Sequence, residues 1–98
     1  MKLLNIVRAA APKKWKATFE TDSGRTKSVS FGAAGMDDYT LTHDKEQRDR
    51  YRTRHRKDLT TAAAKTGVSA GALSWWILWG DSTSFDANVR AYRRHYGV

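Results

Sequence analysis

The residues best suited to chemistry form a dense basic segment from Arg48 to Lys57. Six of its ten residues are Lys or Arg, and Asp49 is its only acid. If the segment is helical, its arginines fall on two neighbouring stripes along the helix surface, and a lysine follows them. One stripe holds Arg48, Arg52 and Arg56, the other holds Arg50 and Arg54, and the lysine is Lys57. Because each guanidinium binds two oxygens at once, the segment predicts contact with successive phosphates of a polyanion.

A second interpretation of this segment is a solvated helix whose arginines pair with neighbouring carboxylates. The acids within reach are Asp44, Glu46, Asp49 and Asp58. The cations outnumber them, which favours an external anion. If exposed, Tyr51 or His55 offers a ring on which a base can stack.

The positive charge is spread over the chain rather than confined to one helix. Lys and Arg number 18 against 10 Asp and Glu, for a formal net charge of +8. A C-terminal group comprises Arg90, Arg93, Arg94 and His95, and an N-terminal group comprises Lys13, Lys14, Lys16, Arg25 and Lys27. This distribution predicts that a wide positively charged surface contacts the partner. It fits DNA, RNA and an acidic protein surface equally well. Zinc-finger spacing, leucine-zipper heptads and the aromatic RNA-recognition motif are absent, so we expect no sequence-specific readout.

Three tryptophans lie within five residues, at Trp75, Trp76 and Trp79. Such a cluster on an apolar run usually belongs to the core. Tryptophan is also enriched at interface hot spots, so we treat Trp75, Trp79 and Tyr51 as interface candidates. Their partner would be another protein or a second copy of the chain in a homo-oligomer.

Catalysis is not expected. The three histidines show no recurring ligand spacing, and the absence of cysteine excludes disulfides and thiolate metal sites. Asp37 and Asp38 suit a cap or turn better than a cation site, and Gly32–Gly35 suits a strand-exit turn better than an anion nest. We therefore predict no enzyme activity, no cofactor and no metal.

The pattern of elements predicts one small domain over residues 1–98 with an α+β fold. Alternating or β-rich runs at 3–9, 14–20 and 26–31 predict a small antiparallel sheet, with a hairpin around Gly24. Helices are expected at 44–58, 69–79 and 85–96, with a turn or short helix at 60–66 and irregular structure at 36–42. Two to three of these helices should cover one face of the sheet.

The expected core combines the apolar faces of these elements. Its members are Trp15, Phe19, Phe31, Leu73, Trp76, Ile77, Phe85, Val89 and Tyr92. Ser69 and a serine or threonine of residues 82–84 are expected to cap helices, and Gly97 to end the last one.

Neither secretion nor membrane insertion is expected. The longest apolar run, Leu73–Trp79, falls far short of the ~20 residues needed to cross a bilayer. The N-terminal residues lack the apolar stretch of about 7–15 residues that marks a secretory signal, so they are expected to belong to the folded domain.

Several segments together give the chain a family resemblance. They are Met1–Leu4, Phe31–Thr40, His43–Lys45, Arg48–Tyr51, Arg54–Lys57 and Gly71–Gly80. In this order they resemble a family of short, basic, uncharacterised proteins of large double-stranded DNA viruses of algae and other protists, and of related environmental sequences. The resemblance supplies no catalytic residue.

The resemblance implies a location in the virion or the infected host cell and favours non-enzymatic roles. The first is sequence-independent binding of nucleic acid. The alternatives are a minor capsid or cement protein that binds acidic capsid surfaces, and an adaptor or inhibitor that docks on a host protein.

Overall fold

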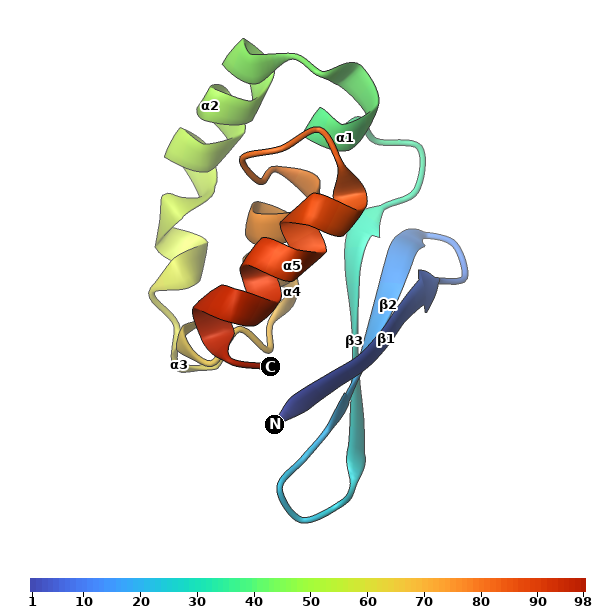
Figure 1. Cartoon of the computed structure of the whole chain (residues 1–98). Helices are drawn as coiled ribbons and strands as arrows, with labels where there is room; N and C mark the ends of the chain where they lie inside the picture. Colours follow the sequence, from blue (N-terminus) through green and yellow to red (C-terminus); the bar gives the residue numbers. More distant parts are fainter.

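The N-terminal third of the chain folds into a three-stranded antiparallel sheet in the order β1-β2-β3. The computed structural model describes residues 1–98. The strands are β1 (Lys2–Arg8), β2 (Lys13–Glu20) and β3 (Thr26–Ala33). The helices that follow lie on one side of this sheet (Figure 1). The predicted α+β class is thus confirmed.

Seven short helical segments follow the sheet. They are α1 (Tyr39–Thr42), α2 (Lys45–His55), the 3-10 turn η1 (Arg56–Leu59), α3 (Ala62–Lys65), α4 (Ala70–Leu73), the π-helical turn η2 (Ser74–Leu78) and α5 (Phe85–Tyr96). The predicted helix at 44–58 comprises α2 and η1, and that at 69–79 comprises α4 and η2. The expectation of irregular structure over 36–42 was wrong for its last four residues. There Asp38 accepts a hydrogen bond from the Thr40 backbone and starts α1.

Strand alternation places one face of the sheet against the helices. In the β2–β3 register, Trp15 lies opposite Phe31 and Ala17 opposite Val29, so all four share the inner face. The register of β1 shifts between Leu3 and Asn5, which explains why its alternation is blurred in the sequence.

The core fills the space between the sheet, η2 and α5. Among the predicted members, Phe19, Phe31, Leu73, Ile77 and Tyr92 are buried, while Trp15, Trp76, Phe85 and Val89 are half-buried against them. Buried residues that the sequence pattern did not select include Leu3, Val68, Leu78 and Trp79. Ser69, Ser84 and Gly97 occupy the helix ends predicted for them.

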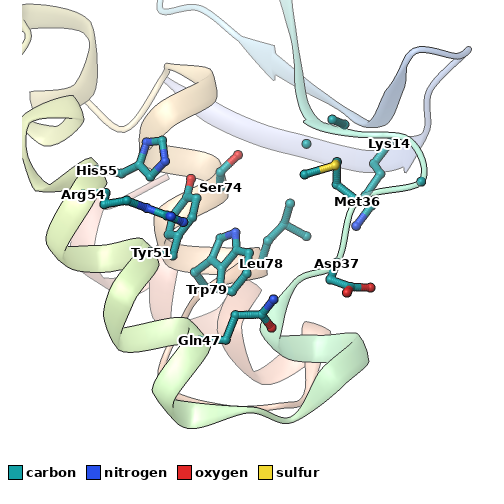
Figure 2. Close-up of a pocket in the computed structure, with 13 residues that line it drawn as sticks. Lys14, Met36, Asp37, Gln47, Tyr51, Arg54, His55, Ser74, Leu78 and Trp79 are labelled. Atoms are coloured by element: carbon teal, nitrogen blue, oxygen red, sulfur yellow. The ribbon is translucent and has the colours of Figure 1, made fainter.

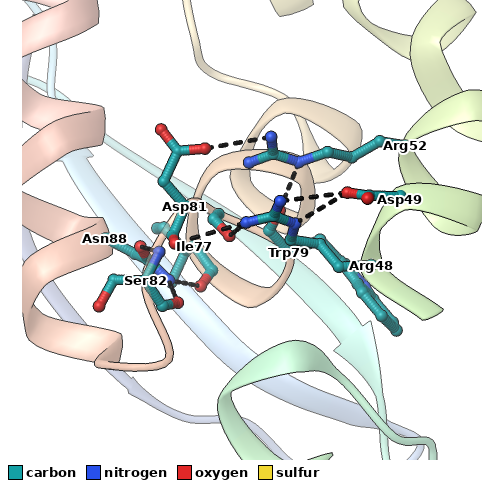
Figure 3. Close-up of polar contacts among 9 residues, drawn as sticks. Arg48, Asp49, Arg52, Ile77, Trp79, Asp81, Ser82 and Asn88 are labelled. Atoms are coloured by element: carbon teal, nitrogen blue, oxygen red, sulfur yellow. Dashed lines mark hydrogen bonds and ion pairs between the residues drawn. The ribbon is translucent and has the colours of Figure 1, made fainter. Parts of the chain in front are cut away.

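The loop between η2 and α5 is fixed by a buried asparagine. The Asn88 side-chain amide donates to the carbonyls of Ile77 (2.9 Å) and Ser82 (2.7 Å), and its oxygen accepts from the Ser82 backbone (3.0 Å). Figure 3 shows Asn88 reaching this loop from α5. The loop therefore presents its remaining carbonyls, at residues 79–81, in a defined position.

No helix in this structure combines the length and apolar character required to cross a membrane. No group of three or more His, Asp or Glu side chains lies close enough together to hold a metal ion.

Candidate nucleic-acid interface

Helix α2 carries most of the basic segment and is defined at both ends by its sequence. Asp44 caps its start by accepting from the Gln47 backbone (3.1 Å), and Glu46 adds negative charge to the first turn. Basic residues occupy the last turn, as the helix dipole favours. The helix turns one side toward η2 and the other toward solvent, so its arginines have two different environments.

Two of the predicted phosphate ligands, Arg48 and Arg52, are anchored inside the protein. Arg52 Nε donates to the Trp79 carbonyl (2.8 Å), and its guanidinium pairs with the Asp81 carboxylate (3.1 Å). Arg48, which is only 9% exposed, donates to the carbonyls of Gly80 and Asp81 and pairs with Asp49 (3.1 Å). Figure 3 shows both guanidinium groups converging on this loop.

We call Arg48 and Arg52 the anchor arginines: Arg52 satisfies the carbonyl of Trp79, the residue that ends η2, and Arg48 satisfies the two loop carbonyls that follow it. The last carbonyls of any helix lack partners within the helix, and cationic side chains are favourable there. The anchor arginines therefore tie α2 to the buried helical layer. This packing role removes Arg48 and Arg52 from the phosphate-binding set expected from the sequence.

A third predicted ligand, Arg93, also has internal partners. Its guanidinium donates to the carbonyls of Leu3 (3.0 Å) and Val98 (3.3 Å), which joins α5 to the first strand and to the chain end. Arg93 is half-buried, and we assign it a structural role as well.

The other cations of the segment face solvent and have no partner. We call Arg50, Arg54, Arg56 and Lys57 the outer cations; all four are exposed, and no carboxylate pairs with any of them. In the whole chain, only Lys14, Arg48 and Arg52 among the 18 Lys and Arg side chains form ion pairs. The second interpretation, in which the arginines pair with carboxylates of the same chain, therefore holds for the anchor arginines and not for the outer cations.

The C-terminal and N-terminal basic groups are also largely free. Arg90 and Arg94 are exposed one turn apart on α5, without a paired carboxylate. In the N-terminal group only Lys14 is neutralised. Lys13, Lys16, Arg25 and Lys27 remain exposed.

The aromatic residues of the segment stack within the protein. Tyr51 lies between Trp79 (ring centroids 4.3 Å apart) and His55 (4.2 Å), in nearly parallel planes. Burial raises the pKa of the Tyr51 hydroxyl to about 12, because the phenolate would lose hydration. Both faces of the Tyr51 ring are therefore covered, and Trp79 is buried. Trp75, the third interface candidate, is half-buried with the Arg52 guanidinium 5.4 Å from its ring centroid.

A cavity of about 420 Å³ adjoins the outer cations, between α2, η2 and the end of β3. Figure 2 shows Tyr51, Arg54 and His55 on one wall and Lys14, Met36 and Asp37 on the other. The lining residues are Lys14, Gly32, Ala33, Gly35, Met36, Asp37, Gln47, Tyr51, Arg54, His55, Ser74, Leu78 and Trp79. Sequence reasoning did not predict this cavity, although it noted several of its members separately.

An ion pair closes the sheet side of the cavity. Lys14 Nζ lies 2.7 Å from the carboxylate of Asp38, and both side chains are nearly buried. Asp38 thus serves as the cap predicted for it and also neutralises Lys14. Asp37 stays exposed and unpaired, and Arg54 is the free cation at the cavity.

Comparison with known proteins finds a similarity to a family of unknown function (DUF5754), whose model matches residues 8–55. No curated protein and no solved structure matches the chain.

The match to DUF5754 covers the end of β1, the rest of the sheet, α1 and α2. It therefore includes Arg50, Arg54 and the two walls of the cavity formed by the sheet and α2. Arg56, Lys57 and the η2 wall lie outside the matched residues. The description of DUF5754 names no activity, so the support for a function comes from the geometry.

Proposed function

We propose that this chain is a non-catalytic basic module that binds nucleic acid through phosphate contacts without reading its sequence. The observation that carries this proposal is the set of outer cations, which are exposed together and lack carboxylate partners. In line with the resemblance to viral proteins, we propose that it acts within a virion or an infected cell.

The arrangement of the outer cations suits a phosphate backbone. Arg50 and Arg54 lie one helical turn apart on α2, and Lys57 follows on the adjoining turn η1. Arg56 adds a charge on the adjoining turn η1. Arg90 and Arg94 on α5 supply a second exposed row. Phosphate contacts of this kind fix position but carry no sequence information.

A capsid or cement role that uses the tryptophans has less support from the geometry. That role needs apolar side chains that are free to enter a neighbouring subunit. The Trp79 ring is buried against Tyr51, and Trp76 stacks on His95 and donates to the Tyr96 hydroxyl (3.1 Å). Among the tryptophans expected at an interface, only Trp75 is left partly accessible.

The proposal is tested by the salt dependence of duplex DNA binding, measured by fluorescence anisotropy. If about five phosphates are neutralised, log K should fall with log[salt] at a slope of about −4 to −5. Replacing all four outer cations by alanine should make this slope shallower by about 3–4 and weaken binding at every salt concentration.

The matched control removes four exposed charges elsewhere. In the variant K13A/K16A/R25A/K27A the net charge falls by the same amount, so a non-specific charge effect would weaken both variants equally. We expect the control to retain most of the wild-type slope. The proposed surface would be refuted if the wild-type affinity did not change with salt concentration. It would also be refuted if the two variants lost equal DNA affinity.

A further inference from the structure

We infer that the cavity between α2, η2 and the end of β3 receives one unpaired nucleobase, so that the preferred nucleic acid is single-stranded. This inference rests on the proposed function and names its substrate class. It places the phosphates of the strand on the outer cations and one base inside the cavity.

Arg54 connects the two parts of this site. It is one of the outer cations, and it also lines the cavity beside Tyr51 and His55 (Figure 2). A strand whose phosphate contacts Arg54 therefore has its attached nucleoside next to the cavity. No rearrangement of the helix is needed to bring a base to it.

The charges around the cavity favour a neutral base on the sheet side and a phosphate on the side of Arg54. At the sheet side, Lys14 is neutralised by Asp38 at 2.7 Å and offers no net charge to an anion. Asp37 on the same side is an unpaired carboxylate, which would repel a phosphate. The free positive charge lies at Arg54, on the side of the outer cations. A neutral base inside and a phosphate outside fit this distribution.

The lining chemistry matches a flat ring with a polar edge. Leu78, Trp79 and Met36 supply apolar and polarisable contact, of the kind that a base face accepts. Gln47 accepts a hydrogen bond from the Thr42 hydroxyl (2.9 Å) through its oxygen, and its amide nitrogen has no partner in the chain. That nitrogen can donate to a base acceptor, while Asp37 can accept from an exocyclic amine such as that of cytosine.

The size of the cavity also fits a nucleoside. Its volume of about 420 Å³ falls within the roughly 300–1,000 Å³ typical of small-ligand sites. A base that is paired and stacked in a duplex cannot enter a site of this kind without leaving the helix. Single strands expose their bases and avoid that cost, which gives the expected preference.

The decisive probes are three oligonucleotides of about 12 nucleotides, a length that suits small single-strand sites. The first is oligo-dC, the second is an abasic strand with the same number of phosphates, and the third is a duplex. Because the first two probes carry equal charge, any difference between them reports the bases. Wild-type protein should bind oligo-dC at least about fivefold more tightly than the abasic strand, because only oligo-dC carries a base that can contact the cavity lining.

The test variant fills the cavity, and its control places the same side chain just outside it. Ala33 lines the cavity, whereas its exposed neighbour Ala34 does not. Ala33→Phe should lower oligo-dC affinity to that of the abasic strand and leave abasic and duplex binding within about twofold of wild type. Ala34→Phe should retain the wild-type preference. If Ala33→Phe fails to fold, Gln47→Ala provides the same test, with a selective loss of oligo-dC binding.

The outcomes distinguish this inference from the proposed function. Equal affinity of wild-type protein for oligo-dC and the abasic strand would overturn base insertion but preserve phosphate binding. Unchanged oligo-dC binding by both folded Ala33→Phe and Gln47→Ala would also overturn it. Failure to bind any of the three probes would overturn the proposed function itself.

Discussion

Arg52 Nε donates to the backbone carbonyl of Trp79 at 2.8 Å, although the two residues lie 27 positions apart in the sequence. Arg50, two residues earlier on the same helix, is exposed and has no such partner. This contact divides the basic segment into arginines that hold the fold together and arginines that remain free for a ligand.

The division predicts opposite effects for Arg52→Ala and Arg50→Ala. Arg52→Ala should lower the free energy of unfolding by about 1.5–3 kcal/mol, because it removes a charge-assisted hydrogen bond from a helix end. Its effect on the salt slope of DNA binding should be small. Arg50→Ala should change stability by less than about 0.5 kcal/mol and make the slope shallower by about 0.9. Urea unfolding and anisotropy measure the two quantities.

The reverse pattern would contradict the division of roles. If Arg52→Ala were as stable as wild type and bound DNA with a reduced slope, Arg52 would have to contact phosphate. Arg48 would then need to be reconsidered in the same way.

The alternating arginines show what the sequence could and could not predict. Composition and helix propensity correctly predicted that residues 45–55 are helical and that cations exceed their acidic partners. The arginines are chemically identical along the sequence, so nothing local distinguishes Arg50 from Arg52. The distinction comes from the carbonyls of residues 79–81, which only the tertiary structure brings to α2.

Two other features were missed for different reasons. Helix α1 has four residues, too few for a recognisable period, although Asp38 carries the local cap signal. The cavity depends on how the end of β3, α2 and η2 pack together, which no single stretch of sequence specifies. In contrast, β2 and α5 were predictable because their apolar periods extend over seven or more residues.

Asn88 is predicted to be among the residues most sensitive to truncation. It is 2% exposed and makes three hydrogen bonds to the loop that receives the anchor arginines. Asn88→Ala should lower the unfolding free energy by at least about 2 kcal/mol, because each buried group left unpaired costs about 1–3 kcal/mol. Chemical denaturation measures this change.

Asn5 provides the control for Asn88. It is exposed on β1, so Asn5→Ala should shift stability by no more than about 0.5 kcal/mol. Similar small effects at both positions would show that the loop does not depend on the Asn88 contacts.

Gly32 is predicted to be required for the close approach of β3 to η2. A Cβ at this position would lie 2.9 Å from Leu78 Cδ1 and 3.1 Å from Lys14 Cβ, and the backbone has φ of +75°. Gly24 has a similar φ of +83°, but a Cβ added there would meet no atom within 4 Å. Gly32→Ala should therefore be less stable than Gly24→Ala by about 1–3 kcal/mol, the cost of overpacking.

The comparison of these two glycines isolates packing from backbone strain. Both variants incur the penalty of a positive φ, so the difference between their melting temperatures reports the contacts with Leu78 and Lys14. Equal melting temperatures would mean that Leu78 and Lys14 both move aside at little cost.

Stability is predicted to fall in alkaline solution, with Tyr51 as one cause. Its pKa is about 12 in the folded protein, above the ordinary value of 10.0, because burial disfavours the phenolate. In the unfolded chain the hydroxyl loses its proton first, so the unfolded state binds fewer protons between these two pH values. The contribution of Tyr51 is thus complete below pH 10 and is lost as the pH rises toward 12.

Tyr51→Phe tests this contribution because phenylalanine keeps the ring that stacks between Trp79 and His55. The variant should lose less stability than wild type on going from pH 9 to pH 11, a range of about two units around the ordinary tyrosine pKa. Burial also raises the pKa of Tyr92 and Tyr96, so some alkaline dependence should persist in the variant. Identical pH profiles for Tyr51→Phe and wild type, measured by denaturation at each pH, would show that the Tyr51 hydroxyl ionises as readily in the folded protein as in the unfolded chain.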